Sequence, residues 1–431
     1  MMLDELPTEL LILIAKPLRA RNINALARTS QSFYSIFNPV LYRADVRENN
    51  QSAFQWAVSH ANLSTLRLTV DAGADISQPL TSHGAPGPAV FRLVRYFDPL
   101  LKFEDVRAVV RFLVERGADV SGKNARGDTV LETAVMCGNS DLARCLIEFG
   151  ADVGVVARDG GCSLLHYAVQ REIPVDVLEM LLRKALDVDA RDKEGRTPLH
   201  RATDVEGVEF LIKNGAEVNV RALDGSTPLI SVIAGSIGQR LPDGRALTKF
   251  NILLENGADS RLANQEGKTP LHFAARCEML AFIKRLLREG VDVHARDEYG
   301  HTPLHYATTE KNRADRVRLL LESGADVHAT DNKGKTPLFG VPRLGKVGLE
   351  QLVQHGADVN ARDGQGNTAL HAMVGWARFK SIEPDLIIAL LVENGLDIDA
   401  RNNDGKTAFQ VAEERGDTYL LDYLRPYRPC N

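Results

Sequence analysis

The sequence predicts an all-α solenoid of about 11 helix-turn-helix units with projecting β-hairpin fingers, preceded by a small three-helix segment. A phrase of the type Thr-Pro-Leu-His returns with threonine at 197, 227, 269, 302, 336 and 368. A glycine followed by a triplet such as Ala-Asp-Val returns at 117, 150, 215, 257, 290, 324, 356 and 395. Self-similarity with a period of about 33 residues is typical of arrays in which each unit packs only on its neighbours.

The threonine phrase predicts the start of the first helix of each unit. Threonine supplies an N-cap oxygen, and proline occupies the first helical position, where a missing N–H is not needed. The second helix is expected in runs such as "VRLLLESGAD". There Val317, Leu320 and Leu321 form an apolar stripe, and Gly324 fits the left-handed position after the helix. The fourth unit has Ala185 at this position, which predicts a different helix end because a left-handed alanine costs about 1–2 kcal/mol.

The stretch "VDVHARDEYGHTPLH" alternates through Val291 and Val293 and then turns, which predicts an extended finger before the next cap. Together these residues resemble the ankyrin repeat from about 52 to 425, with weaker units opening at 52, 89, 129 and 163 and a closing one at 407. The resemblance implies an array, residues 52–431, that binds a protein through finger tips and the inner helix face. Which repeats bind, and what the extra residues near 235–245 and 375–384 do, stays open.

Composition and charge argue against nucleic-acid binding and membrane insertion and indicate a compartment. The net charge of −5 disfavours nucleic acid as a partner. The longest apolar run at the start, 10–15, is six residues, whereas a membrane-spanning helix needs about 20. Five cysteines without a Cys-x-x-Cys pair suit a reducing compartment, so we expect a cytoplasmic or nuclear protein.

Three "GKT" tripeptides, at Gly267, Gly334 and Gly405, lack the earlier glycine of a phosphate loop and are interpreted as finger turns followed by caps. Cys162 and His166 could pass for a thiol and its base, but both fit the repeat register. The other histidines of that register, His200, His272, His305 and His371, recur by period and do not converge as metal ligands. We therefore expect no enzyme activity, no cofactor and no metal.

A row of basic residues lies nine positions before the histidine register: Lys123, Arg191, Arg221, Arg296, Arg362 and Arg401. Such a row could grip an acidic partner. The alternative is that Asp192, Asp297 and Asp363, which directly follow three of these arginines, offset their charge. The client-binding candidates on the fingers are Arg191, Arg221, Arg296, Tyr299, Arg362 and Arg401.

The opening helix expected near 8–16 is apolar nearly all round, so it must be covered on every side. Its segment, 1–45, is followed by a polar linker, 46–51, and is too short to bury much surface alone. Residues 6–37 resemble an F-box: a Leu-Pro start, a leucine-rich helix and a closing aromatic pair. The matching residues are Leu6, Pro7, Leu10, Leu11, Ile14, Leu18, Ile23, Leu26, Phe33 and Tyr34.

The F-box resemblance implies docking on a Skp-family adaptor and, through it, on a cullin, while the rest of the chain selects a client protein. On this hypothesis the chain is the substrate-recognition subunit of a Skp/cullin/F-box ubiquitin ligase. The alternative is an ankyrin-repeat scaffold with no ubiquitin role, in which the N-terminal helices cap the apolar edge of the first repeat.

Overall fold

The computed structural model describes residues 40, 42–43, 45–46, 52–77, 89–95, 102–124, 126–154, 161–184, 186–237, 244–309, 314–374 and 384–427. The described residues form two compact units. Unit 1 comprises those up to Lys193 together with Arg201–Gly215, and unit 2 comprises Glu194–His200 and those from Ala216 onward. All ten predicted adaptor-binding residues, from Leu6 to Tyr34, lie outside the described residues, as does Ala185.

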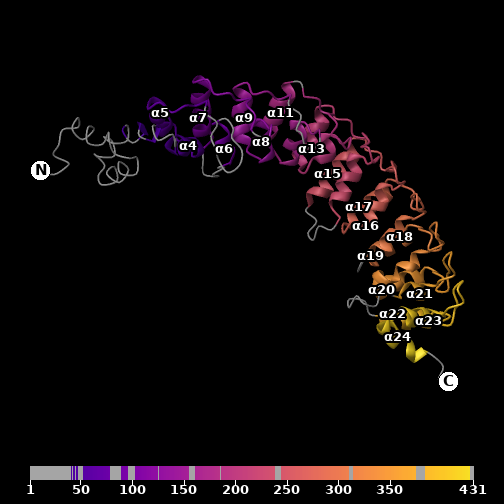
Figure 1. Ribbon diagram of the computed structural model, residues 1–431. Coiled ribbons are helices and arrows are strands. Elements are labelled where there is room, and N and C mark those ends of the chain that lie inside the picture. Colours follow the sequence, from indigo (N-terminus) through magenta and orange to yellow (C-terminus); the bar gives the residue numbers. More distant parts are fainter. Residues whose placement is uncertain are drawn as a thin grey trace. The chain divides into compact units, whose positions relative to one another are not determined.

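Unit 1 is a succession of helix pairs. Its first helices are α4 (Ser52–Ser59), α6 (Phe91–Arg95), α8 (Val130–Met136) and α10 (Leu164–Gln170). Its second helices are α5 (Leu63–Asp71), α7 (Phe103–Glu115), α9 (Ser140–Glu148), α11 (Val175–Arg183) and α13 (Val205–Lys213). Figure 1 shows α5, α7, α9 and α11 in one row and α4, α6 and α8 in another, so the pairs stack as two layers.

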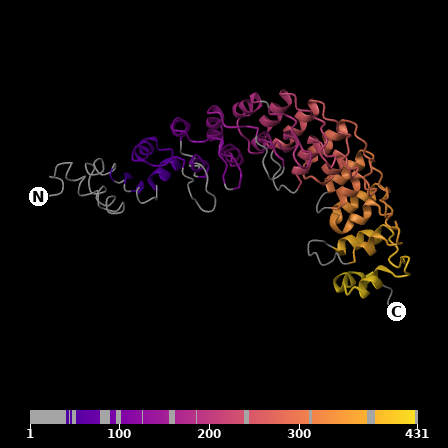
Figure 2. The ribbon, with the colours of Figure 1, turned by 45° about the horizontal axis from the view of Figure 1, so that its top comes forward.

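Unit 2 repeats this arrangement, with α12 (Pro198–Arg201) beginning in it. The first helices that follow are α14 (Pro228–Gly235), α16 (Pro270–Arg276), α18 (Pro303–Thr308), the 3-10 turn η2 (Pro337–Gly340), α21 (Ala369–Ala372) and α23 (Ala408–Glu414). The second helices are α15 (Gly244–Glu255), α17 (Leu280–Arg288), α19 (Ala314–Glu322), α20 (Val341–Gln354), α22 (Pro384–Glu393) and α24 (Thr418–Leu424), before the 3-10 turn η3 (Arg425–Tyr427). The later pairs are orange and yellow in Figure 2.

The all-α class is confirmed for the described residues, whose only β-type pairings are isolated bridges. Two of these join Lys123 to Thr129 and Arg401 to Thr407. The other described fingers are turns without paired strands, unlike the extended hairpins expected from the sequence. Within the described residues, no helix combines the length and the apolar character needed to cross a membrane.

The predicted caps are confirmed at the first helices. Thr227 Oγ1 accepts a hydrogen bond from the N–H of Ile230, and Pro228 follows at the first helical position. Thr129 and Glu132 form a reciprocal capping box at α8. The repeat from Thr336 differs, because Phe339 stands where a capping histidine is found in its neighbours. Thr336 Oγ1 is buried there without a hydrogen-bond partner, and only the 3-10 turn η2 forms.

The predicted end of the second helix is also confirmed. Gly324 has φ = 89°, and its N–H donates to Leu321 O at 2.9 Å. The next N–H, of Ala325, donates to Leu320 O at 3.0 Å, which closes the helix. Leu320 and Val317 have no solvent-exposed surface, so the expected apolar stripe packs in the core between the two helix layers.

Candidate protein-interaction surface

The finger tips of unit 2 are joined by backbone hydrogen bonds. At each junction, the N–H of one tip residue donates to the carbonyl of the preceding finger's tip at 2.8–2.9 Å. The pairs are Leu223 with Glu194, Gln265 with Asp224, Glu298 with Glu266, Asn332 with Tyr299, Gly364 with Lys333, and Asn403 with Gln365. We call this row of tips the finger strip. These hydrogen bonds make the finger strip a continuous surface. Because only backbone atoms are involved, no pattern of side chains in the sequence predicted it.

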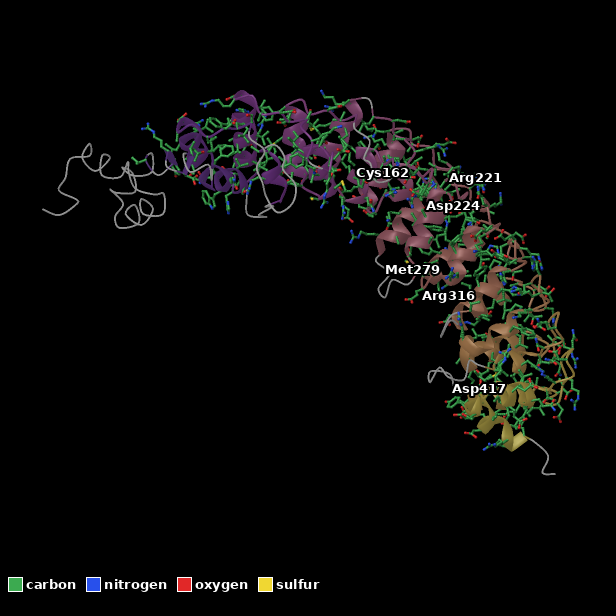
Figure 3. The ribbon with its side chains drawn as sticks, in the orientation of Figure 1. Cys162, Arg221, Asp224, Met279, Arg316 and Asp417 are labelled. Carbon is green, nitrogen blue, oxygen red and sulfur yellow. The ribbon has the colours of Figure 1, made fainter. Side chains whose placement is uncertain are left out.

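The finger arginines add a second set of links. Arg221 Nη2 donates to Ala263 O at 2.7 Å, and Arg362 Nη1 donates to Arg401 O at 3.0 Å. Arg296 donates in the same way to Thr330 O, and Arg401 Nη1 bonds Gly405 O within its own finger at 2.7 Å. All four residues remain exposed, as Figure 3 illustrates for Arg221 beside Asp224. Arg221, Arg296 and Arg362 therefore tether neighbouring fingers while keeping their charge at the surface.

At two of the three described positions where an aspartate follows a finger arginine, the two side chains do not form an ion pair. No ion pair joins Arg296 to Asp297 or Arg362 to Asp363, four residues that the structure describes. Instead, Asp297 and Asp363 are buried and accept hydrogen bonds within their own fingers. Each arginine binds a backbone carbonyl, whereas each aspartate accepts hydrogen bonds from its own finger.

The register histidines are structural links. Nδ1 of His272, His305 and His371 accepts the N–H of the capping threonine at 3.0–3.2 Å. Their Nε2 atoms lie 3.0–3.1 Å from carbonyls in the next finger, those of His301, Lys335 and Lys406. Only the neutral tautomer with hydrogen on Nε2 satisfies both contacts, and burial lowers the pKa of all three.

His200 makes the same contacts with Thr197 and Ser226 O, and His166 makes the first of them with Ser163. Among the described residues, no group of histidines, cysteines and carboxylates could hold a metal ion. Gly267, Gly334 and Gly405 have φ between 73° and 77° at finger turns, which supports the turn interpretation of the "GKT" tripeptides.

One part of the finger strip gathers aromatic and basic groups. We define the Tyr299 cluster as Lys268, Tyr299, His301 and Tyr306. The ring centroid of His301 lies 6.0 Å from that of Tyr299 and 5.6 Å from that of Tyr306, and Lys268 Nζ lies 5.7 Å from the Tyr306 ring. Tyr299 is 53% exposed. An exposed aromatic among basic groups is typical of a binding hot spot.

Buried carboxylates hold the Tyr299 cluster in place. Tyr306 donates its hydroxyl hydrogen to Asp297 Oδ2 at 2.7 Å. His301 Nε2 lies 3.4 Å from Asp331 Oδ2, and its Nδ1 lies 3.6 Å from Asp297 Oδ2. Burial alone would raise the pKa of Asp297, but the Tyr306 hydroxyl, the backbone N–H of His301 and the His301 ring together lower it. Asp297 is therefore an ionised anchor beneath the cluster.

The predicted client-binding residues are only partly brought together. Arg221, Arg296, Tyr299, Arg362 and Arg401 lie along the fingers of unit 2, whereas Arg191 is an exposed residue of unit 1. Sequence reasoning missed three members of the Tyr299 cluster. Their signal was positional: Lys268 and His301 lie four residues before a register histidine, and Tyr306 lies one residue after.

Stacked helix pairs joined by hydrogen-bonded fingers define a repeat protein with a long exposed binding surface. The family model that matches is that of ankyrin repeats, over residues 102–192, 154–222 and 244–331. The chain therefore contains ankyrin repeats.

Three relatives illustrate the similarity. The human B-cell lymphoma 3 protein is 31% identical over 241 residues, which cover 50% of this chain and 51% of the relative. Mouse ankyrin repeat and SOCS box protein 16 is 38% identical over 171 residues, covering 40% and 36%. The Legionella pneumophila phosphocholine transferase AnkX is 26% identical over 185 residues, covering 36% and 19%. The chain thus spans about half or less of the length of these relatives.

Proposed function

We propose that this protein is the substrate-recognition subunit of a Skp/cullin/F-box ubiquitin ligase. Ankyrin repeats imply protein–protein interaction, and the proposal assigns that role to a client protein held on the array. The N-terminal residues 6–34 dock on a Skp-family adaptor and, through it, on a cullin. Ubiquitin transfer takes place on other subunits, so the chain itself is not an enzyme, and we place it in the cytoplasm or nucleus.

The finger strip is the observation that supports client binding most directly. Its backbone ladder fixes each tip against the next, so little conformational freedom is lost when a partner binds. The Tyr299 cluster offers an exposed aromatic ring next to His301, and Lys268, which pairs with Glu266, lies over the neighbouring Tyr306 ring. We expect the client to contact this part of the strip and to present acidic or polar groups to it.

The sequence pattern of the opening segment supports adaptor binding. An apolar helix within 45 residues needs a covering surface, and the F-box pattern supplies one in a second protein. By its name, the SOCS-box relative also joins ankyrin repeats to a second kind of module, which is the layout proposed here.

One observation favours the scaffold alternative. Asp45 Oδ2 accepts the N–H of Ala53, at the start of α4, at 2.9 Å, and Val40 and Tyr42 are buried. The end of the opening segment is therefore hydrogen-bonded to the start of the first repeat. Such contacts suit a cap, although a linker held against the array would make them too.

Co-elution of the full chain with a purified Skp adaptor in size-exclusion chromatography tests the proposal. We expect a complex with the unchanged chain and none with Leu10→Asp. Leu223→Asp is the matched control, because it makes the same change at a finger tip that is 64% exposed. Absence of a complex with the unchanged chain contradicts the ligase role and leaves the scaffold.

A chain lacking residues 1–45 separates the two roles of the opening segment. If the segment is a cap, its removal exposes the apolar edge of the first repeat, and the truncated chain aggregates or unfolds at a lower temperature. If it is an adaptor-binding module, the truncated chain keeps its helical circular dichroism and loses only the complex.

A further inference from the structure

A groove of about 420 Å³ lies between α11 and α13 in unit 1. These are second helices, so the groove lies in a different helix layer from the capped first helices of the repeats. Figure 1 shows α11 and α13 as successive elements of the stack. Val175, Leu182 and Phe210 supply its apolar lining, and Glu206, Glu209 and Lys213 are charged lining residues.

The groove lies between two second helices, α11 and α13, that are not joined by an ion pair in the part of the chain that the structure describes. The preceding second helices, α9 and α11, are joined by an ion pair of 2.6 Å between Arg144 and Asp176. No ion pair joins α11 to α13 among the described residues of these helices. Phe210 is 6% exposed, so its side chain packs below the surface while the space above it stays open.

The charge of the groove is uneven. Glu179 and Arg183 pair with each other along α11 at 3.2 Å, which leaves Glu206, Glu209 and Lys213 of α13 without an ion-pair partner. Positions i, i+3 and i+7 share one helix face, so these three side chains border the groove on one side. Two carboxylates against one ammonium leave an excess negative charge toward the start of α13.

Asp204, at the N-cap of α13, lies in this negative environment. Burial is the main cause of its raised pKa, and the negative charges of Glu172 and Glu206 also raise it. The hydrogen bond from the Gly207 N–H acts in the opposite direction. Carboxylates therefore crowd where α13 begins. An apolar side chain could fill the groove, while a cation beside it would meet Glu206 and Glu209.

We propose that the α11/α13 groove is a second docking site, for a partner-protein segment that carries an apolar side chain next to a lysine or arginine. The apolar side chain packs on Leu182 and Phe210, and the cation lies against Glu206 and Glu209. The site is separate from the finger strip and does not depend on the proposed ligase role. It gives the array a surface for a second protein while a client occupies the fingers.

Two small probes mimic this recognition element on the full chain: 4-phenylbutylamine, and 4-phenylbutanoate as its charge-reversed match. Titration followed by ligand-observed NMR should show the amine binding about threefold to fivefold more tightly, because an exposed charge contact contributes about that factor. Glu206→Gln with Glu209→Gln should remove the difference. Glu255→Gln, an exposed glutamate at the end of α15, should leave it unchanged.

Leu182→Ser should weaken both probes equally, since it removes apolar surface and no charge. Circular dichroism confirms that each variant is folded. The proposal is overturned if neither probe binds at a concentration of about 10 mM, which is roughly the weakest dissociation constant expected for a fragment of this size. Equal affinity for both probes, or an amine affinity that the double variant leaves unchanged, also overturns it.

Discussion

The hydroxyl of Tyr306 donates a 2.7 Å hydrogen bond to Asp297 Oδ2, so the first helix α18 holds the finger of its own repeat. Arg201 makes the equivalent contact with Asp192, where Nη2 lies 2.7 Å and Nε 2.9 Å from one carboxylate oxygen. Both pairs are nine residues apart and share one register. A single aspartate therefore organises the finger turn and anchors it to a helix.

Tyr306→Phe removes the donor but keeps the ring. We expect a loss of about 1.5–3 kcal/mol of unfolding free energy in a urea titration at pH 7, because the lost bond is made to an ionised carboxylate. Tyr299→Phe, on an exposed side chain, should cost much less. A similar loss for the two variants would contradict the anchoring role of the Tyr306 hydroxyl.

Acid should weaken this anchor too. The folded-state pKa of Asp297 is lowered, so its contribution is complete above about pH 4, the ordinary range of an aspartate, and is lost as the pH falls through the folded pKa. In the Tyr306→Phe variant the pKa of Asp297 should be lowered less, because the hydroxyl donor is gone. Urea titrations from pH 5 to pH 2 should therefore show the difference between the variant and the unchanged chain shrinking as the pH falls.

A second pH effect comes from the capping histidines. Burial lowers the pKa of His272, His305 and His371, so the unfolded chain binds protons first as the pH falls below about 6.5. The contribution of these histidines to the free energy of unfolding should not change above about pH 7.5, and it should decrease as the pH falls from about 6.5 to 5. Protonation of Nδ1 also removes the acceptor that caps the helix.

The chain contains its own control for this effect. Gln410 makes the same reciprocal cap with Thr407 and does not titrate. His305→Gln should therefore keep the cap and reduce the slope of unfolding free energy against pH between 6.5 and 5. An unchanged slope would show that protonation of His305 does not account for the acid sensitivity.

Arg296→Ala tests the tether between fingers. It removes the hydrogen bond to Thr330 O and should cost about 0.5–1.5 kcal/mol in a denaturant titration. Leu320→Ala, in the core between the helix layers, should cost about 2–5 kcal/mol. Equal losses would mean that the assignment of core and finger positions is wrong.

Gly324→Ala tests the left-handed helix end. With φ = 89°, alanine should cost about 1–2 kcal/mol, although no atom lies within 4 Å of the added methyl group. Gly235→Ala is the matched comparison, because that glycine lies in α14 with equal space and without a positive φ. There, alanine should be neutral or stabilising by up to about 1 kcal/mol. The two changes should move the thermal unfolding midpoint in different directions.

Sequence reasoning succeeded where a backbone position restricts the residue type. The threonine caps and Gly324 belong to this group, because a hydroxyl acceptor or a missing Cβ is required there. It did not predict the anchoring role of Asp297, since that role depends on contacts with His301 and with Tyr306 nine residues later. The finger strip and the α11/α13 groove depend on contacts between repeats, which single positions do not encode. The adaptor-binding residues stay a prediction.

The backbone hydrogen bonds of the finger strip all run in one direction, since the N–H of each finger tip donates to the carbonyl of the finger before it. Deleting one internal repeat would therefore leave a matched donor and acceptor able to rejoin, provided that the flanking helices can stack. Evolution or an engineer could then lengthen or shorten unit 2 by whole modules without redesigning the joints. The side chains on the tips would decide which partner is bound, and the joints between tips would be interchangeable.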